Sequence, residues 1–230
     1  MRRTLPLLAV LIALAAAPGA DARYVELGAD SAPATKASCP EDCQGIGRVS
    51  GYMGRSGGRT NPYYIRRDGK VVAFTITLGK PDAEQTEFFT NLYGGPPQVR
   101  LSILRPGKTR KTRLTHRLLR QSALFRVDSY FGSSPTFALD EPLDVEKGKI
   151  VALTVPTWAP AFGVNLPRTN WWRSSRRRGD CDNVSQRAAQ QFVGGLRIFG
   201  CTYFRARLLY TVLYVPEPRP TDGSDRRRGR

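Results

Sequence analysis

The sequence predicts a mostly β protein, built as an antiparallel β-sandwich with one short helix. Residues 68–78, with the sequence DGKVVAFTITL, recur in similar form over 147–155 as KGKIVALTV. Asp-Gly or Lys-Gly supplies a turn before each apolar run, and Val, Ile, Phe and Thr suit a strand buried on both faces. Residues 203–215 form a further, longer apolar run. We therefore expect all three segments to be central strands, with 203–215 the longest.

The two ends of the chain are expected to lie outside the folded domain. Residues 1–22 have the pattern of a signal peptide, with two arginines, a short apolar run and small residues before a cleavage point near Ala22. Residues 23–38 are rich in Ala, Ser and Pro and predict a flexible leader, and 216–230 predict a disordered basic tail. We expect one domain over 39–215, secreted or located in the cell envelope.

Four cysteines follow the predicted signal peptide. An even number of cysteines in an oxidising compartment predicts two disulfides, and we expect the pairs Cys39–Cys43 and Cys181–Cys201. The second pair would close a loop of 20 residues, worth about 3 kcal/mol in the chain-entropy model. A four-thiolate zinc site is the alternative, but its ligand pairs normally lie closer together than 181 and 201.

The first half of the domain is expected to contain strands followed by the helix. Residues 45–58 contain several glycines and predict one short strand among turns. The helix is predicted near 82–93, because Pro81 precedes it, acidic residues occupy its first turn and two glycines follow it. Phe88 and Leu92 lie one turn apart and are expected to face the core, with Phe89 and Tyr93 beside them.

The second half of the domain is expected to continue as strands. Residues 98–104 alternate apolar and polar side chains and predict a half-exposed strand, and a Pro-Gly turn leads into another strand over 109–119. This succession of short strands favours a jelly-roll or galactose-binding-like layout. The remaining expectations are strands at 63–65, 123–130, 135–139 and 143–145, an irregular loop over 156–170 and a short helix over 185–192.

Composition and motifs bear on the class of function. The formal charge of +17 attracts polyanions through the summed field of the protein. G-x-S-x-G, H-E-x-x-H and phosphate-binding glycine motifs are all missing from the sequence, so no catalytic residue, metal site or cofactor is predicted. The single histidine, His116, lies among Lys and Arg, and we interpret it as a surface residue of a basic strand.

Two basic segments are candidate ligand-binding sites. On a strand over 109–119, alternate cations would line one face, although such a basic edge also prevents aggregation between strands. The pair Trp171-Trp172 precedes a run of arginines, and indole rings stack on sugars or bases while arginines bind phosphate, sulfate or carboxylate. The same tryptophans could instead plug one end of the sandwich. The predicted ligand-binding residues are Lys111, Arg113, Arg117, Trp158, Trp171, Trp172, Arg173, Arg176 and Arg177.

These features predict an exported, noncatalytic binding or structural domain that engages anionic polysaccharides or other polyanions through a basic, Trp-bearing surface. One alternative is a carbohydrate-active hydrolase or lyase, which would use paired carboxylates. Another is an accessory domain that has no ligand. The acidic residues clustered at one bend, which the hydrolase or lyase would require, are Asp140, Glu141, Asp144 and Glu146.

Overall fold

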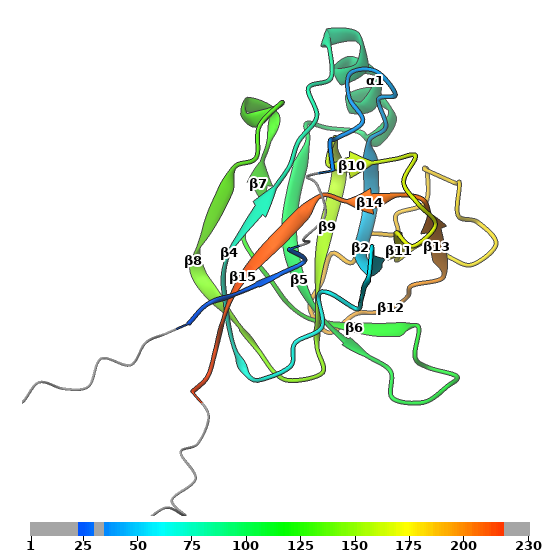
Figure 1. Cartoon of the computed structure of the whole chain (residues 1–230). Coiled ribbons are helices and arrows are strands. Elements are labelled where there is room, and N and C mark those ends of the chain that lie inside the picture. The colour runs from blue at the N-terminus through cyan, green and yellow to red at the C-terminus, as the bar shows by residue number, and fades with distance from the viewer. Residues whose placement is uncertain (1–22, 30–34, 219–230) are drawn as a thin grey trace, which may run out of the picture.

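The computed structural model describes residues 23–29 and 35–218. Its described part is mostly antiparallel β with one α-helix, which lies at one end of the strands (Figure 1). A four-stranded sheet has the order β1-β15-β4-β8, and a larger curled sheet has the order β12-β6-β5-β9-β2-β11-β13. One cluster of buried apolar residues draws on both sheets, so the predicted β-sandwich class is confirmed.

The strands are bounded as follows. The smaller sheet contains β1 (Val25–Leu27), β15 (Tyr210–Pro216), β4 (Gly69–Ile76) and β8 (Thr136–Val145). The larger sheet contains β12 (Leu196–Ile198), β6 (Thr115–Gln121), β5 (Gln98–Pro106), β9 (Ile150–Ala159), β2 (Ile46–Ser56), β11 (Trp171–Ser174) and β13 (Cys201–Phe204). The short strands are β3 (Arg59–Thr60), β7 (Phe125–Arg126), β10 (Phe162–Gly163) and β14 (Arg207–Leu208).

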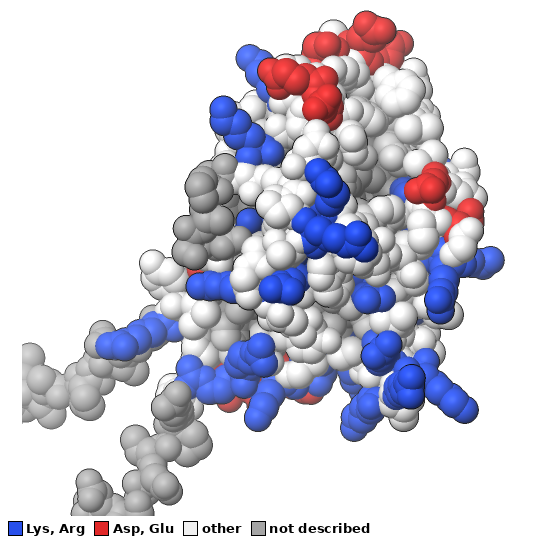
Figure 2. Space-filling model, turned by 45° about the vertical axis from the view of Figure 1, so that its right-hand side comes forward, with Lys and Arg blue, Asp and Glu red and all other residues white. Residues whose placement is uncertain are grey.

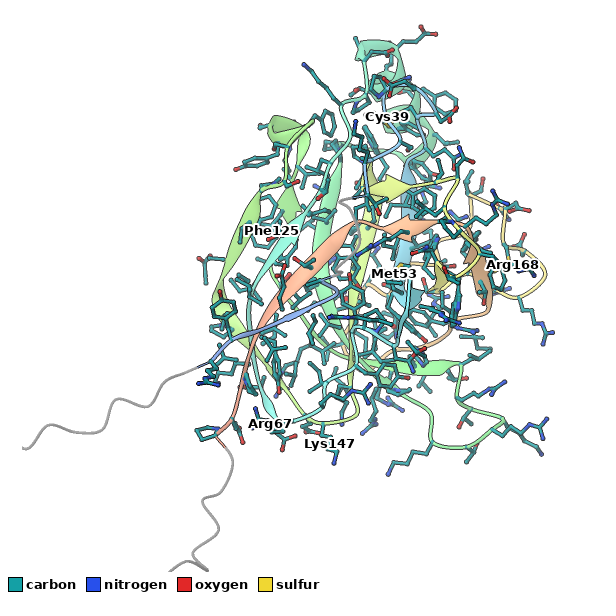
Figure 3. All side chains as sticks on the ribbon, viewed as in Figure 1. Cys39, Met53, Arg67, Phe125, Lys147 and Arg168 are labelled. Atoms are coloured by element: carbon teal, nitrogen blue, oxygen red, sulfur yellow. A yellow bond between two sulfur atoms is a disulfide. The ribbon has the colours of Figure 1, made fainter. Side chains whose placement is uncertain are left out.

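The two similar apolar runs form central strands, as predicted. β4 is an inner strand of the smaller sheet, and β9 is the middle strand of the larger one. The turns that precede these strands also meet, because the Asp68 carboxylate accepts a hydrogen bond from the backbone N–H of Lys147 at 2.6 Å. Figure 3 shows Lys147 and the neighbouring Arg67 together at the end of the sandwich opposite Cys39.

The run over 203–215 is divided between the sheets, contrary to the prediction of one long strand. Arg205 has a left-handed backbone with a φ of 60°, and it ends β13 of the larger sheet. The chain then passes through β14 and enters the smaller sheet as β15, which pairs with β4. Only β15 is therefore a central strand, and the backbone turn at Arg205 is the reason.

The longest strand is β2, with 11 residues, where the sequence predicted one short strand among turns. Two of its glycines, Gly51 and Gly54, face aromatic rings of the neighbouring strand β11. A Cβ added at Gly51 would lie 2.8 Å from the Trp172 ring, and one at Gly54 would lie 1.8 Å from the Trp171 ring. These glycines thus make space for two indole rings. Strand propensity along the sequence does not include this packing, so it could not predict the strand.

The helix α1 (Ala83–Tyr93) is confirmed close to its predicted position. Asp82 caps its N-terminus by accepting a hydrogen bond from the Gln85 N–H at 2.8 Å, and Gly94 ends it with a φ of 74°. The predicted core face is correct for Phe89 and Tyr93 and wrong for Phe88 and Leu92. Phe89 and Tyr93 are buried, and Phe89 packs on Trp158 with ring centroids 5.1 Å apart, whereas the Phe88 side chain is 59% exposed.

Other predicted elements need correction. Residues 185–192 form no helix, and 123–130 contain only β7 and a 3₁₀ turn at Asp128–Tyr130. The strands at 135–139 and 143–145 are one strand, β8, and 63–65 contributes a single bridge from Tyr64 to Ile150. The loop over 156–170 contains the end of β9 and the whole of β10.

The ends of the chain also differ from the prediction where the structure describes them. The expected leader over 23–38 contributes β1, which pairs with β15 and buries Leu27. Pairing gives this segment a fixed place in the smaller sheet. The predicted signal peptide over 1–22, and residues 219–230 of the predicted tail, lie outside the described residues.

Candidate functional site

The charged side chains are unevenly distributed over the surface. In the view of Figure 2, most visible acidic side chains gather around α1, whereas Lys and Arg are spread over the middle and lower parts. Three ion pairs join residues within the described ranges, although the chain has 36 Lys and Arg against 19 Asp and Glu. Most of the positive surface is therefore not neutralised by neighbouring carboxylates.

The basic segment between β5 and β6 is a turn rather than one long strand. Lys111 and Arg113 are exposed on this turn, and Arg117 lies on β6. Thr109 and Thr112 close the turn, because the backbone N–H of each donates to the hydroxyl of the other at 3.2 Å. The expected row of three cations on one strand face is thus wrong, since local threonine hydrogen bonds replace strand pairing.

A cavity of about 460 Å³ lies beside this turn. Arg105, Lys108 and Arg117 supply its cations, Leu196 supplies an apolar wall, and no carboxylate from residues 23–29 or 35–218 lines it. The Arg117 guanidinium also donates to the Gly194 carbonyl at 2.6 Å, which holds the loop before β12 against β6. The turn and its cavity form a surface suited to an anionic ligand.

The three predicted tryptophans lie in different environments. Trp158 has no exposed surface and packs among aromatic rings near α1, and Trp172 is 3% exposed with its ring stacked 4.6 Å from Tyr203. Both are core residues, which agrees with the alternative that the tryptophans fill the sandwich and leaves neither ring open to a ligand. Trp171 alone is partly exposed, because successive residues of β11 point to opposite faces of the sheet.

Trp171 belongs to an exposed cluster of rings and guanidinium groups. The Arg173 guanidinium lies 5.6 Å from the Trp171 ring centroid, and the Arg168 guanidinium lies 5.2 Å from that of Phe204. The Trp171 and Phe204 rings are 6.4 Å apart, because the two residues are paired across β11 and β13. We call these four residues the aromatic–arginine cluster. Phe204 was not predicted, since only strand pairing brings it to Trp171. Arg168, labelled in Figure 3, was not predicted either, and it joins the cluster through its contact with the Phe204 ring.

The two other predicted arginines have different roles. Arg176 is buried and donates to the Cys181 carbonyl at 2.9 Å and to the Gly47 carbonyl at 3.1 Å. It therefore joins the disulfide loop to β2 and lies apart from the exposed surface. Arg177 is exposed beside that loop. The structure thus brings Trp171 and Arg173 together and leaves Arg176 in the interior.

The disulfides Cys39–Cys43 and Cys181–Cys201 are both present, as predicted, with S–S distances of 2.05 and 2.10 Å. Two disulfides indicate an oxidising, extracellular environment. Within the described ranges, no helix combines the length and apolar character that crossing a bilayer demands.

His116 is buried, and the prediction that it lies at the surface is wrong. Its Nε2 lies 2.8 Å from the Tyr52 hydroxyl, and its ring stacks 4.6 Å from Phe199. Burial lowers the pKa of the imidazole to about 4, so the ring is neutral at pH 7. Thr115 and Arg117 are partly exposed while His116 points inward, which is the alternation of a strand.

A row of buried hydroxyl groups crosses three strands of the larger sheet. The Thr154 hydroxyl lies 2.6 Å from both Ser50 and Ser102, which belong to the strands on either side of β9. The Ser50 hydroxyl also accepts a hydrogen bond from the backbone N–H of Gln190 at 3.2 Å. The irregular segment 188–190 is therefore buried against this row and fixed by it.

A second cavity, of about 420 Å³, lies between the C-terminus of α1 and the segment that precedes β12. Arg48, Arg187 and Arg197 supply its charge, Phe192 supplies a ring and Thr157 supplies a hydroxyl. Among the residues that the structure describes, no carboxylate lines it. We call it the arginine pocket. Its three arginines are far apart in the sequence, and no local motif marks them, so sequence reasoning missed it.

The acidic cluster has little of the character of a hydrolase site. Asp144 and Glu146 are exposed, and hydrogen bonds from Lys70 and Lys149 lower their pKa values. The general acid of a glycosidase needs a raised pKa instead. Asp140 and Glu141 are also exposed, beside a cavity of about 360 Å³. Within the described residues, no three His, Cys, Asp or Glu side chains gather as metal ligands.

Comparisons of the chain with protein-family models, with curated proteins and with solved structures found no match. Its function is therefore argued from the site alone.

Proposed function

We propose that this protein is an exported, noncatalytic binding protein that engages anionic polysaccharides or other polyanions through its basic, aromatic surface. In this proposal residues 1–22 direct export and are removed near Ala22, and the mature protein acts outside the cell or in the cell envelope. The two disulfides, which favour an oxidising compartment, support this location.

The observation that supports the proposal best is the aromatic–arginine cluster. Its two rings offer planes for sugar rings or bases, and Arg173 and Arg168 supply positive charge beside them. The basic turn, with its cavity at Arg105, Lys108 and Arg117, adds further cations without a carboxylate in the wall. A polymer that bears regular negative charge matches both features, because each lysine or arginine that pairs with it releases a counterion from the polymer.

An array of anionic and neutral glycans and other polyanions tests this proposal. The protein is expected to bind sulfated, phosphorylated or uronate-rich polymers and to leave neutral glycans unbound. Trp171→Ala should weaken this binding by at least about fivefold, because loss of one stacking plane removes roughly 1–3 kcal/mol. Phe88→Ala is the matched control, since Phe88 is also an exposed ring but lies on α1 near acidic residues.

Two outcomes would refute the proposal. One is equal binding to neutral and anionic glycans, because the charge would then have no role. The other is an absence of binding to every polyanion on the array. Trp172→Ala is unsuitable here, because Trp172 is buried and its removal would leave a cavity in the core.

A further inference from the structure

The arginine pocket has the features of a specific anion site, and it contains none of the residues that the sequence analysis assigned to ligand binding. Arg48 comes from β2, whereas Arg187, Phe192 and Arg197 come from the segment that leads into and includes β12. Three guanidinium groups around one cavity repel each other, and no carboxylate in the wall offsets that repulsion. An anion bound inside the pocket would attract all three guanidinium groups and so offset their mutual repulsion.

Arg48 is held at the pocket by an irregular backbone. It lies in a β-bulge between Gly47 and Val49 and has a φ of 50°, in the left-handed region that non-glycine residues rarely adopt. Its Nε donates to the Tyr93 carbonyl at 3.3 Å, at the C-terminus of α1. The bulge therefore directs a cation toward the negative end of the helix and fixes it in the pocket wall.

Arg197 provides an unsatisfied donor. It lies on β12 opposite His116, and its Nε is buried without a hydrogen-bond partner within the described part of the chain. Buried N–H groups of this kind are nearly always paired, because leaving water without a new acceptor is unfavourable. That Nε has almost no accessible surface, so a bound anion would meet the terminal nitrogens of the Arg197 guanidinium, which lines the pocket.

The segment that carries Arg187 and Arg197 is held in place by hydrogen bonds to the larger sheet. The Gln190 side chain donates to the Gly195 carbonyl at 2.7 Å and to the His116 carbonyl at 3.2 Å, while its backbone N–H binds Ser50. Arg117 holds the Gly194 carbonyl from the neighbouring strand. The pocket wall is therefore positioned before any ligand arrives, which reduces the entropy that binding would cost.

We propose that the arginine pocket binds one oxyanion group, a phosphate, sulfate or carboxylate, carried on a sugar ring that packs against Phe192. The Phe192 side chain is 63% exposed, so one face of its ring is open to such contact. The volume of about 420 Å³ lies within the range of about 300–1,000 Å³ found for small-ligand sites. This inference rests on the proposed function for one point only, that the sugar is a terminal unit of an anionic polymer.

Isothermal titration calorimetry of the whole protein with small ligands tests the pocket. The probes are glucose 6-phosphate, glucose 6-sulfate and glucuronate, with inorganic phosphate to separate the oxyanion from the ring, and glucose as the neutral comparison. We expect saturable binding of one charged sugar per protein and none of glucose. Arg197→Gln should weaken this binding by at least about tenfold, because a charge-assisted hydrogen bond is lost.

Matched variants separate the pocket from the general field of the protein. Arg67→Gln removes an equal charge from an exposed position at the end of the sandwich opposite Cys39 (Figure 3) and should change affinity by no more than about twofold. Phe192→Ala should weaken glucose 6-phosphate and leave inorganic phosphate unchanged, because only the sugar touches the ring. Arg187→Gln repeats the charge test at an exposed position, in case Arg197→Gln disturbs folding.

The outcomes distinguish the pocket from the proposed function. If polyanions bind but no charged sugar does, or if Arg67→Gln weakens sugar binding as much as Arg197→Gln and Arg187→Gln do, the pocket inference is overturned and the polymer-binding proposal stands. If charged sugars bind in the pocket while every polyanion fails, the pocket stands and the polymer-binding proposal fails.

Discussion

The buried histidine gives a prediction that needs no mutation to measure. His116 is the single histidine of the chain, so the C2 proton of its ring is a unique signal in an NMR titration. Burial beside Tyr52 and Phe199 lowers its pKa from the ordinary 6.5 to about 4. The ring should therefore remain neutral until the pH falls well below 6. A measured pKa near 6.5 would contradict the packing described for this ring.

The same shift predicts how stability depends on pH. Between about pH 6.5 and 4 the unfolded chain binds a proton at His116 that the folded chain does not, so the free energy of unfolding falls as the pH falls. Above about pH 6.5 His116 is neutral in both states, and the free energy of unfolding keeps its full value. Below that pH it falls at roughly 1.4 kcal/mol per pH unit, and the loss reaches about 3 kcal/mol by pH 4.

Urea unfolding at several pH values measures this loss. Carboxylates such as Asp144, whose pKa is lowered by Lys70, also reduce stability in acid, so the wild type alone is insufficient. His116→Gln removes the titrating ring and should flatten the curve between about pH 6.5 and 4, even if it lowers stability throughout. The reasoning fails if the two proteins lose stability in parallel over this range.

Two further predictions concern packing and cross-links. Gly54→Ala should lower the free energy of unfolding by about 1–3 kcal/mol, because the new Cβ would lie 1.8 Å from the Trp171 ring, whereas Gly58→Ala meets no atom within 4 Å and should change it by less than about 0.5 kcal/mol. Urea unfolding compares the two variants, and equal effects would contradict the packing of β2 on β11. Replacing Cys181 and Cys201 by Ala should cost about 3 kcal/mol for a separation of 20 residues, and a loss under about 1 kcal/mol in the same assay would refute that value.

Local sequence signals were sufficient for the central strands and for the ends of the helix. The runs that became β4 and β9 have apolar side chains on both faces, and Asp82 and Gly94 occupy the positions that caps require. Each of these features depends on a few neighbouring residues. The disulfide pairs could also be inferred from the cysteine count and spacing.

Side chains were assigned to the wrong face on two elements, Phe88 and Leu92 on α1 and His116 on β6, and in both cases the cause is a contact with residues distant in the sequence. Both Phe88 and Phe89 begin an apolar pair along α1, and the pair that is buried is the one that meets Trp158 of β9. His116 was misplaced because its cationic neighbours suggested an exposed strand, although neighbours on a strand face opposite ways. Contacts between distant strands decided both cases.

The candidate site could be predicted only in part for the same reason. Trp171 and Arg173 are two residues apart on one strand, so the sequence placed them together correctly. Phe204 joins them through strand pairing, and the arginine pocket collects residues 48, 187 and 197 around the end of α1. No local sequence pattern predicts that Phe204 lies beside Trp171 or that these three arginines share a pocket.

The affinity of the protein for an anionic polymer, measured as a function of salt concentration, tests the central claim most directly. We expect the affinity for a sulfated or phosphorylated polymer to fall at least about tenfold between roughly 50 and 200 mM salt, as counterion release requires. A neutral polymer of the same length should not bind at either concentration. Affinity that is unchanged over this range, or equal for the two polymers, would contradict binding through the cationic surface.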